Sequence, residues 1–95
     1  MSGFIIFPST KFKKDYKKYL KKKNELTGIQ NTISLLSQNG TDSIPKEMKP
    51  HKLIGNYKGC WECHISPDLL LIWQQEEQVN EITLIRVGTH SDLFK

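Results

Sequence analysis

The sequence lacks the features of membrane and secreted proteins. Its longest uninterrupted apolar run, residues 69–73, has five residues, whereas a membrane-spanning helix needs about 20. No basic stretch precedes the short apolar run near the N-terminus, as it would in a signal peptide. The chain has only two cysteines, and a disulfide is not expected in a reducing compartment. We therefore expect a cytosolic (cytoplasmic) protein without a membrane span.

The composition is that of a folded domain. Hydrophobic residues make up 37% of the chain and charged residues 25%, which distinguishes it from a disordered protein. Its 95 residues suffice for one hydrophobic core with little to spare. We see no internal repeat, low-complexity segment or second domain, and therefore expect a single domain over residues 1–95.

Positive charge is concentrated near the N-terminus. The formal net charge is only +4, but eight of the 14 basic residues are lysines within residues 11–23. Such a cluster indicates a polyanionic partner on one face. The alternative is a solvated lysine face that maintains solubility. Like charges at i+3 and i+4 spacing destabilise a helix, and a polyanion would relieve that repulsion.

Apolar patterns predict one strand and two helices in the first half. Residues 4–7, followed by Pro8, predict a buried strand. Ser9 or Thr10 can cap the first helix. Its apolar arc would consist of Phe12, Tyr16, Tyr19 and Leu20. A second amphipathic helix is predicted for residues 25–38, and two such helices in succession typically form a hairpin packed on a sheet.

The second half predicts three strands, at residues 60–65, 69–75 and 81–87, and residues 52–57 fit a shorter one. The side chains of residues 60–65 alternate between two faces. The core face would receive Trp61, Cys63 and Ile65, and the other face Cys60, Glu62 and His64. We predict an α+β fold in the order β-α-α-β-β-β, with the helical hairpin packed on an antiparallel sheet of about four strands.

The three histidines and the single arginine all lie in the second half, and we group with them two of the acidic residues that lie between them. These residues are His51, Glu62, His64, Asp68, Arg86 and His90. Histidine serves as acid or base near neutral pH, and the planar fork of arginine fits two phosphoryl oxygens. Cleavage of RNA without a metal needs a base for the 2′-hydroxyl, an acid for the departing 5′-oxygen and a cation for the phosphate. The group therefore predicts a ribonuclease site.

Arg86 is the residue least easily explained as an ordinary surface residue. It falls in a mostly apolar predicted strand, with Ile82 and Leu84 expected on its own side. A charge in such a place needs an anionic partner. We expect that partner to be Glu62 or Asp68.

Other candidates have plain structural alternatives. His51 could be an ordinary surface histidine, and Asp68 can stabilise the turn after Pro67. His90 could belong to a tail, and Phe94 could simply close the core.

The pair Cys60-x-x-Cys63 raises the possibility of a structural zinc site. An odd separation on a strand points the two thiols to opposite faces, and no second pair of this spacing is present. We therefore expect neither a metal nor another cofactor.

Three stretches of the second half form a recognisable set. They read Lys-Pro-His51-Lys-Leu-Ile-Gly55, Glu62-Cys-His64-Ile-Ser-Pro-Asp68-Leu-Leu-Leu-Ile and Arg86-Val-Gly-Thr-His90-Ser-Asp-Leu-Phe94. With the order of predicted elements, this set resembles the YafQ branch of the RelE-like (RelE/ParE) toxins over nearly the whole chain. The resemblance implies a bacterial toxin of a type II toxin–antitoxin system. Such toxins cut messenger RNA, typically in the ribosomal A site, and a cognate antitoxin holds them inactive.

The resemblance also implies roles for single residues. His51, His64, Asp68 and His90 would form the acid–base group, Arg86 would stabilise the transition-state phosphate, and Phe94 would position or stack a base. Some relatives carry an aromatic residue directly after the motif aspartate, where this chain has Leu69. The lysine-rich helix would contact ribosomal RNA through Lys14, Lys18 and Lys21.

Two rival functions remain open at this point. The domain could be a non-catalytic basic module that binds RNA or a protein partner, with structural histidines. It could also be a structural zinc domain around Cys60 and Cys63, in which case the purified protein would contain metal.

Overall fold

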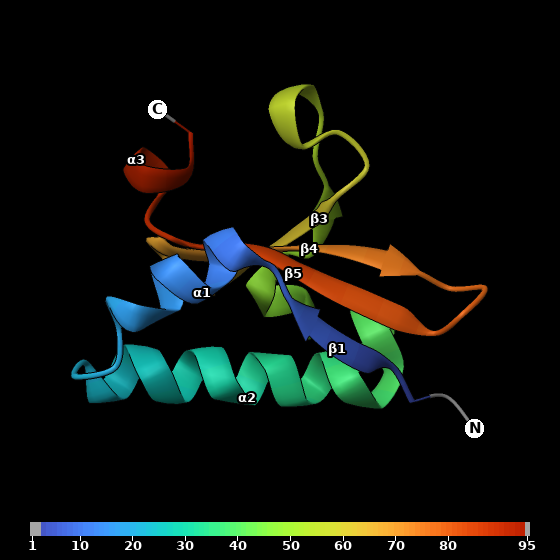
Figure 1. Ribbon diagram of the computed structural model, residues 1–95, viewed down its shortest axis with the longest axis horizontal. Coiled ribbons are helices and arrows are strands. Elements are labelled where there is room, and N and C mark those ends of the chain that lie inside the picture. The colour runs from blue at the N-terminus through green and yellow to red at the C-terminus, as the bar shows by residue number, and fades with distance from the viewer. Residues whose placement is uncertain (1–2, 95) are drawn as a thin grey trace.

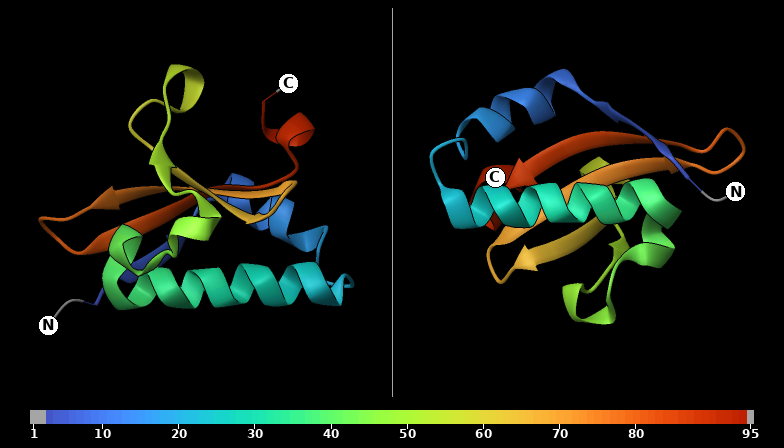
Figure 2. Two further views of the ribbon diagram at one scale, coloured as in Figure 1. Left: turned by 180° about the vertical axis from the view of Figure 1, so that it is seen from behind. Right: turned by 90° about the horizontal axis from the view of Figure 1, so that it is seen from below.

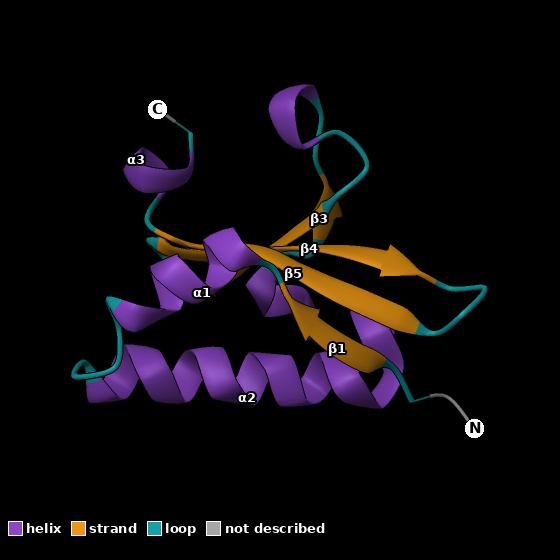
Figure 3. Cartoon of the chain, viewed as in Figure 1, coloured by secondary structure: helices purple, strands orange, loops and turns teal. Residues whose placement is uncertain are grey.

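The computed structural model describes residues 3–94, which form a five-stranded sheet with a long helix across one face and a shorter helix along one edge (Figures 1 and 3). The strands are β1 (Ile5–Pro8), β2 (His51–Lys52), β3 (Trp61–Ser66), β4 (Leu69–Glu76) and β5 (Glu81–Gly88). The helices are α1 (Thr10–Lys17), α2 (Lys23–Asn39) and the short α3 (His90–Leu93), with single 3-10 turns at Gly40–Ser43, Lys46–Met48 and Gly55–Tyr57. No helix within residues 3–94 is long and apolar enough to cross a membrane. The predicted α+β class is confirmed.

The sheet is mixed, with strand order β1-β5-β4-β3-β2. The pairs β2–β3, β3–β4 and β4–β5 are antiparallel as predicted, whereas β1 runs parallel to β5. The short strand fitted to residues 52–57 is instead the two-residue β2. The strand predicted at residues 4–7 is present, but the prediction that it is buried was wrong, because β1 is an edge strand in which Ile5 is 60% and Phe7 45% exposed. An apolar run alone does not tell an edge strand from a central one.

Helix α1 begins at a side-chain cap and ends early. The backbone N–H of Phe12 donates to Ser9 Oγ at 3.1 Å, which satisfies one of the free donors of the first turn. Phe12 and Tyr19 are buried as predicted, but Leu20 is 53% exposed. Leu20 was predicted on the apolar side of a longer helix. Because α1 ends at Lys17 and a turn follows, Leu20 lies outside the helix and does not face the core.

Helix α2 covers one face of the sheet and ends at a glycine. Its residues Ile29 and Leu36 are fully buried. Gly40 follows with φ of 61°, and a Cβ there would lie 2.7 Å from the side-chain oxygen of Gln75. Only glycine fits this conformation and this contact.

The two faces of the sheet differ in what covers them (Figures 1 and 2). One face, here called the covered face, packs on α1 and α2 and includes Leu71, Trp73 and Leu84. The other, the open face, carries a smaller apolar cluster around Leu70 and Ile72. Of the helices and 3-10 turns of residues 3–94, α3 and the Gly55–Tyr57 turn stand on that side in Figure 1. The open face is therefore the accessible one.

Candidate active site

A β-bulge decides which way Arg86 points. The β4–β5 register pairs Ile72 with Arg86 but Trp73 with Leu84, so that Ile85 is an extra residue in β5. Ile85 packs with the open-face cluster, whereas Leu84 belongs to the core of the covered face. The expectation that Arg86 shares a side with Ile82 and Leu84 was therefore wrong. The inserted residue reverses the alternation and turns Arg86 to the open face.

The strand register joins predicted site residues into one row. His51 pairs with Glu62, Glu62 with Ile72, and Ile72 with Arg86. Directly opposed residues of neighbouring strands share a face, so the row crosses the open face from β2 to β5. Three strand spacings separate the backbones of His51 and Arg86 by roughly 14 Å. A second row beside it runs from His64 through Leu70 to Gly88.

His51 and His64 lie together at the β2–β3 end of these rows. Their ring centroids are 6.5 Å apart. The Nε2 atom of His51 lies 3.2 Å from Glu62 Oε1, and its Nδ1 lies 2.8 Å from the backbone oxygen of Lys49. Glu62 is only 5% exposed, and its Oε2 has no hydrogen-bond partner within residues 3–94. A buried carboxylate and a carbonyl thus fix the orientation of an exposed imidazole.

Arg86 is bound by an aspartate of α1. Its Nε donates to Asp15 Oδ2 at 2.6 Å and its Nη2 to Asp15 Oδ1 at 3.0 Å. This bidentate bond raises the pKa of Arg86 further above its ordinary value, so the guanidinium stays charged. The expected partners were wrong: Glu62 binds His51, and Asp68 accepts from the backbone of His90.

Asp15 was missed, although the sequence contains a signal for it. It is the only acidic residue within residues 11–23. It lies three residues after Phe12 and four before Tyr19, on the apolar side of the helix. A carboxylate on an apolar helix face and an arginine in an apolar strand each need a partner of opposite charge. Asp15 and Arg86 meet this need for each other.

Tyr57 was also missed, and no local pattern marks it. Its hydroxyl donates to the backbone oxygen of Leu93 at 3.1 Å and accepts a long bond from Arg86 Nη1 at 3.4 Å. Its ring meets that of Phe94 edge-on, with centroids 5.5 Å apart. Tyr57 thus links the Gly55–Tyr57 turn, β5 and α3, which are distant in sequence.

Helix α3 displays His90 and Phe94 side by side. Their ring centroids lie 4.9 Å apart, and Phe94 is 38% exposed. Two hydrogen bonds fix the start of α3: Asp68 Oδ1 accepts from His90 N at 3.1 Å, and Thr89 Oγ1 accepts from Asp92 N at 3.2 Å. Leu93, and not Phe94, enters the apolar cluster. Asp68 therefore anchors the segment that presents both rings.

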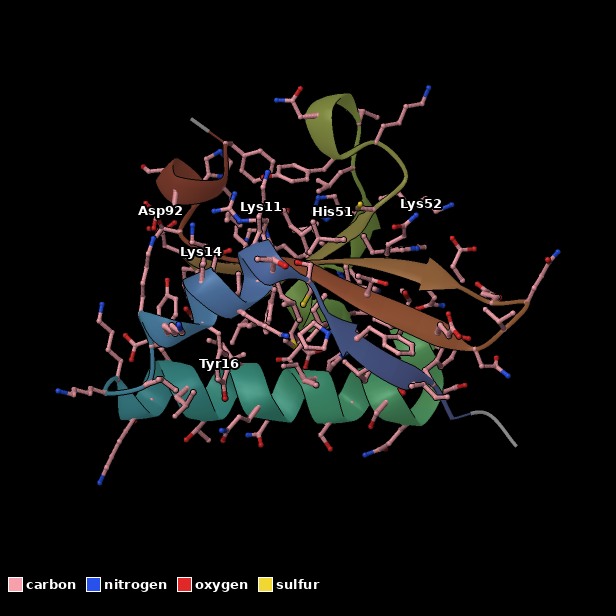
Figure 4. The ribbon with its side chains drawn as sticks, in the orientation of Figure 1. Lys11, Lys14, Tyr16, His51, Lys52 and Asp92 are labelled. Carbon is pink, nitrogen blue, oxygen red and sulfur yellow. The ribbon has the colours of Figure 1, made fainter. Side chains whose placement is uncertain are left out.

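A polar depression of about 440 Å³ lies beside Arg86. Its lining residues are Lys18, Asn56, Tyr57, Arg86, Asp92 and Leu93. One residue of the lysine-rich segment therefore borders the arginine. In Figure 4, Lys11 and Lys14 project from α1 toward the side of α3 and His51, whereas Tyr16 points toward α2. Lys21 is exposed in the turn after α1. Basic side chains of α1 thus flank the open face.

Cys63 of β3 and Cys60, directly before β3, point to opposite faces of the sheet, as the alternation predicted. Cys63 is buried in the core of the covered face, and Cys60 packs at the edge of the open-face cluster. Both thiols are free. Burial raises the pKa of both, and that of Cys63 to about 12. Among residues 3–94 no three His, Cys, Asp or Glu side chains are grouped to hold a metal ion.

Comparisons with known proteins point to one family. Residues 5–95 match the family described as "Bacterial toxin of type II toxin-antitoxin system, YafQ". The "mRNA interferase toxin YafQ" of Escherichia coli (strain K12) is 31% identical over 86 residues, which is 90% of each chain. The crystal structure of YafQ from E. coli strain BL21(DE3) superposes with a TM-score of 0.85 at 28% identity, covering 97% of this chain and 99% of that one. The toxin of the E. coli DinJ–YafQ complex gives a TM-score of 0.82 at 30% identity, with the same coverage.

Proposed function

Because this chain belongs to the YafQ family of toxins of type II toxin–antitoxin systems, with its RelE-like fold, we propose that it is an mRNA endoribonuclease that inhibits translation. The curated relative bears the name mRNA interferase toxin. The observation that carries the proposal is the row from His51 to Arg86 across the open face. It gathers proton-transfer groups and a phosphate-binding cation on one accessible surface.

The proposed reaction needs no group from outside the chain. The 2′-hydroxyl of a nucleotide attacks the adjacent phosphorus and gives its proton to a base. The bond from phosphorus to the 5′-oxygen breaks, and an acid protonates that oxygen, leaving a 2′,3′-cyclic phosphate and a 5′-hydroxyl. The candidate acids and bases are His51, His64, Asp68 and His90. A positioned acid or base contributes about 10²–10⁴-fold to such a reaction.

Arg86 has the role of stabilising the charge that builds on the phosphate. Its guanidinium is fixed by Asp15 and remains partly accessible, with 20% of the side chain exposed. Hydrogen-bond donors that are oriented before the reaction stabilise a developing charge most effectively. The neighbouring Lys18 adds a second cation in the same depression.

Phe94 is the aromatic residue we propose for base stacking. Its exposed ring stands next to His90, so a base stacked on it would bring the adjoining phosphate toward that imidazole. Stacking of a base on an aromatic ring is worth about 1–3 kcal/mol. Leu69, which follows the motif aspartate, is 3% exposed in the core, so base stacking falls to Phe94.

The RNA presented to this site is proposed to be a message on the ribosome. Lys14, Lys18 and Lys21 are exposed and would bind ribosomal RNA phosphates in the cytosol. Contacts to phosphate are electrostatic and weaken steeply with salt. We also propose a cognate antitoxin partner, as the related toxin has in the DinJ–YafQ complex.

The test is primer extension on a message under translation, with the purified protein. We expect new 5′ ends in the message when ribosomes are present. His90→Ala should lower the cleavage rate about 10²–10⁴-fold, whereas Ser91→Ala, one residue further on the same helix, should not change it. An absence of cleavage with and without ribosomes would instead indicate the non-catalytic binding module.

A further inference from the structure

Asp15 is held more firmly than the arginine that it binds. It is 5% exposed, and both of its oxygens accept hydrogen bonds from Arg86. Oδ2 also accepts from the backbone N–H of Val87 at 3.1 Å. The carboxylate is thus fixed by the strand itself, next to the residue that it orients.

The position of Asp15 follows from the way α1 continues the sheet edge. Strand β1 pairs with β5 only as far as Leu84. Beyond it, Ser9 N donates to Leu84 O at 2.9 Å and Ser9 Oγ donates to Ile85 O at 3.0 Å. Helix α1 then lies along the rest of β5 (Figure 2, right), where Asp15 binds Val87. Because these bonds fix the helix, the guanidinium must adapt to the carboxylate.

The bond pattern decides which edge of Arg86 remains available. A guanidinium has five N–H groups. Asp15 takes Nε and one hydrogen of Nη2, and the long bond to Tyr57 uses one hydrogen of Nη1. Within residues 3–94 this leaves one hydrogen on each terminal nitrogen, and Arg86 lines the depression. Two coplanar N–H groups of this kind bind two phosphoryl oxygens.

Net charge alone would not hold a phosphate there. Among the lining residues and Asp15, the formal charges of Lys18 and Arg86 are offset by those of Asp15 and Asp92. Recognition of a phosphate in this depression therefore depends on how the guanidinium is oriented. The orientation in turn depends on Asp15.

We infer that Asp15 is a positioning residue of this enzyme, which holds the guanidinium of Arg86 so that its outer Nη1–Nη2 edge meets the scissile phosphate. The inference rests on the proposed function, because it names the group that orients the proposed phosphate-binding residue. Asp15 does not touch the substrate and acts through Arg86.

The first test compares Asp15→Asn with Asp42→Asn. The amide keeps the shape of Asp15 and can still accept from Val87, but it loses the charge that pairs with Arg86. Misplacement of a reacting group by about 1 Å can cost about 10²-fold in rate. We expect kcat for cleavage of translated message to fall by about that factor, with KM changed only a few-fold. Asp42 is exposed in a 3-10 turn, and Asp42→Asn should match the unmodified chain.

The second test does not require Asp15→Asn to fold well on its own. Arg86→Ala should leave room for a guanidinium beside Asp15, so that millimolar methylguanidinium restores part of the cleavage. The double variant with Asp15→Asn lacks the carboxylate and should not respond. Arg86→Ala leaves the buried carboxylate of Asp15 without its partner, and the double variant removes that charge. We therefore expect the double variant to be at least as stable as Arg86→Ala.

The outcomes separate the two proposals. If the unmodified chain does not cut translated message, the proposed function fails. A different outcome is that the unmodified chain cuts the message, Arg86→Ala does not, and Asp15→Asn keeps the full kcat. That result would refute only the role of Asp15. Equal rescue of the single and double variants by methylguanidinium, or rescue of neither, also contradicts that role.

Discussion

The covered and open faces of the sheet are built by the same strands but are stabilised in different ways. On the covered face Cys63, Leu71 and Trp73 are fully buried under α1 and α2. On the open face the apolar cluster is small, and the row that passes through its member Ile72 also carries Glu62 and Arg86. One face is held by close packing. The other holds polar side chains through specific bonds.

The comparison shows how a chain of this size positions chemical groups. On the open face, Glu62 orients the imidazole of His51 and Asp15 orients the guanidinium of Arg86. Such bonds fix a side chain without covering it, which an accessible site requires. Substitutions on the open face should therefore affect activity more than stability, and those on the covered face the reverse.

Among the substitutions that compare the two faces, the largest effect is expected from Arg86→Lys, which keeps the charge and removes the planar guanidinium. Lysine cannot bind Asp15 and a phosphate through one planar group. Loss of an oriented donor to a transition-state anion typically costs about 10²–10³-fold in kcat. Single-turnover cleavage, with thermal unfolding measured in parallel, checks this. Cleavage close to that of the unmodified chain would contradict the assigned role of Arg86.

On the covered face, Leu71→Ala should destabilise the fold by about 2–5 kcal/mol, because it leaves a cavity in a fully buried site. Cleavage per folded molecule should change little. Leu20→Ala is the matched control, since Leu20 is 53% exposed, and it should cost no more than about 0.5 kcal/mol. Urea unfolding of the two variants measures the difference. Equal destabilisation would show that the covered face is not the main core.

The two thiols extend the comparison to alkaline pH. Burial raises the pKa of Cys63 from 9.0 to about 12 in the folded chain. Above about pH 9 the thiol loses its proton in the unfolded chain but keeps it in the folded chain. The stability that depends on this thiol is therefore fully present below about pH 9 and is lost as pH rises toward 12. In that range the free energy of unfolding should fall less steeply with pH in Cys63→Ala than in the unmodified chain, by up to about 1.4 kcal/mol per pH unit. Cys60→Ala should reduce it less, and urea titrations at pH 8 to 11 test the order.

The smallest effect is expected from single lysines that border the open face. Lys18→Ala should lower the slope of log affinity for ribosomes against log salt by about 0.9, the loss of one phosphate contact. Lys46→Ala, in the 3-10 turn Lys46–Met48, should leave the slope unchanged. Replacing Lys14, Lys18 and Lys21 together by Glu should weaken co-sedimentation with ribosomes without unfolding the chain. Unchanged co-sedimentation would refute the RNA contact.

Local patterns of the sequence were enough for much of this molecule. A cap at Ser9 or Thr10, the presence of two helices, the three long strands and the alternation of Cys60 and Cys63 depend on residues a few positions apart. The residue types of the site were also evident, because histidine and arginine are few in this chain. That His51, His64 and Arg86 share one face of the sheet became known only from the strand register.

Tertiary structure decided the rest, because the deciding contacts join residues far apart in the chain. The bulge at Ile85 turned Arg86 to the open face, and alternation within β5 alone predicted the opposite. Its partner Asp15 is 71 residues away, and it meets Arg86 only because α1 continues the sheet edge where β1 ends. A local pattern shows that a buried charge needs a partner, but only the packing of helix on strand determines which residue that partner is.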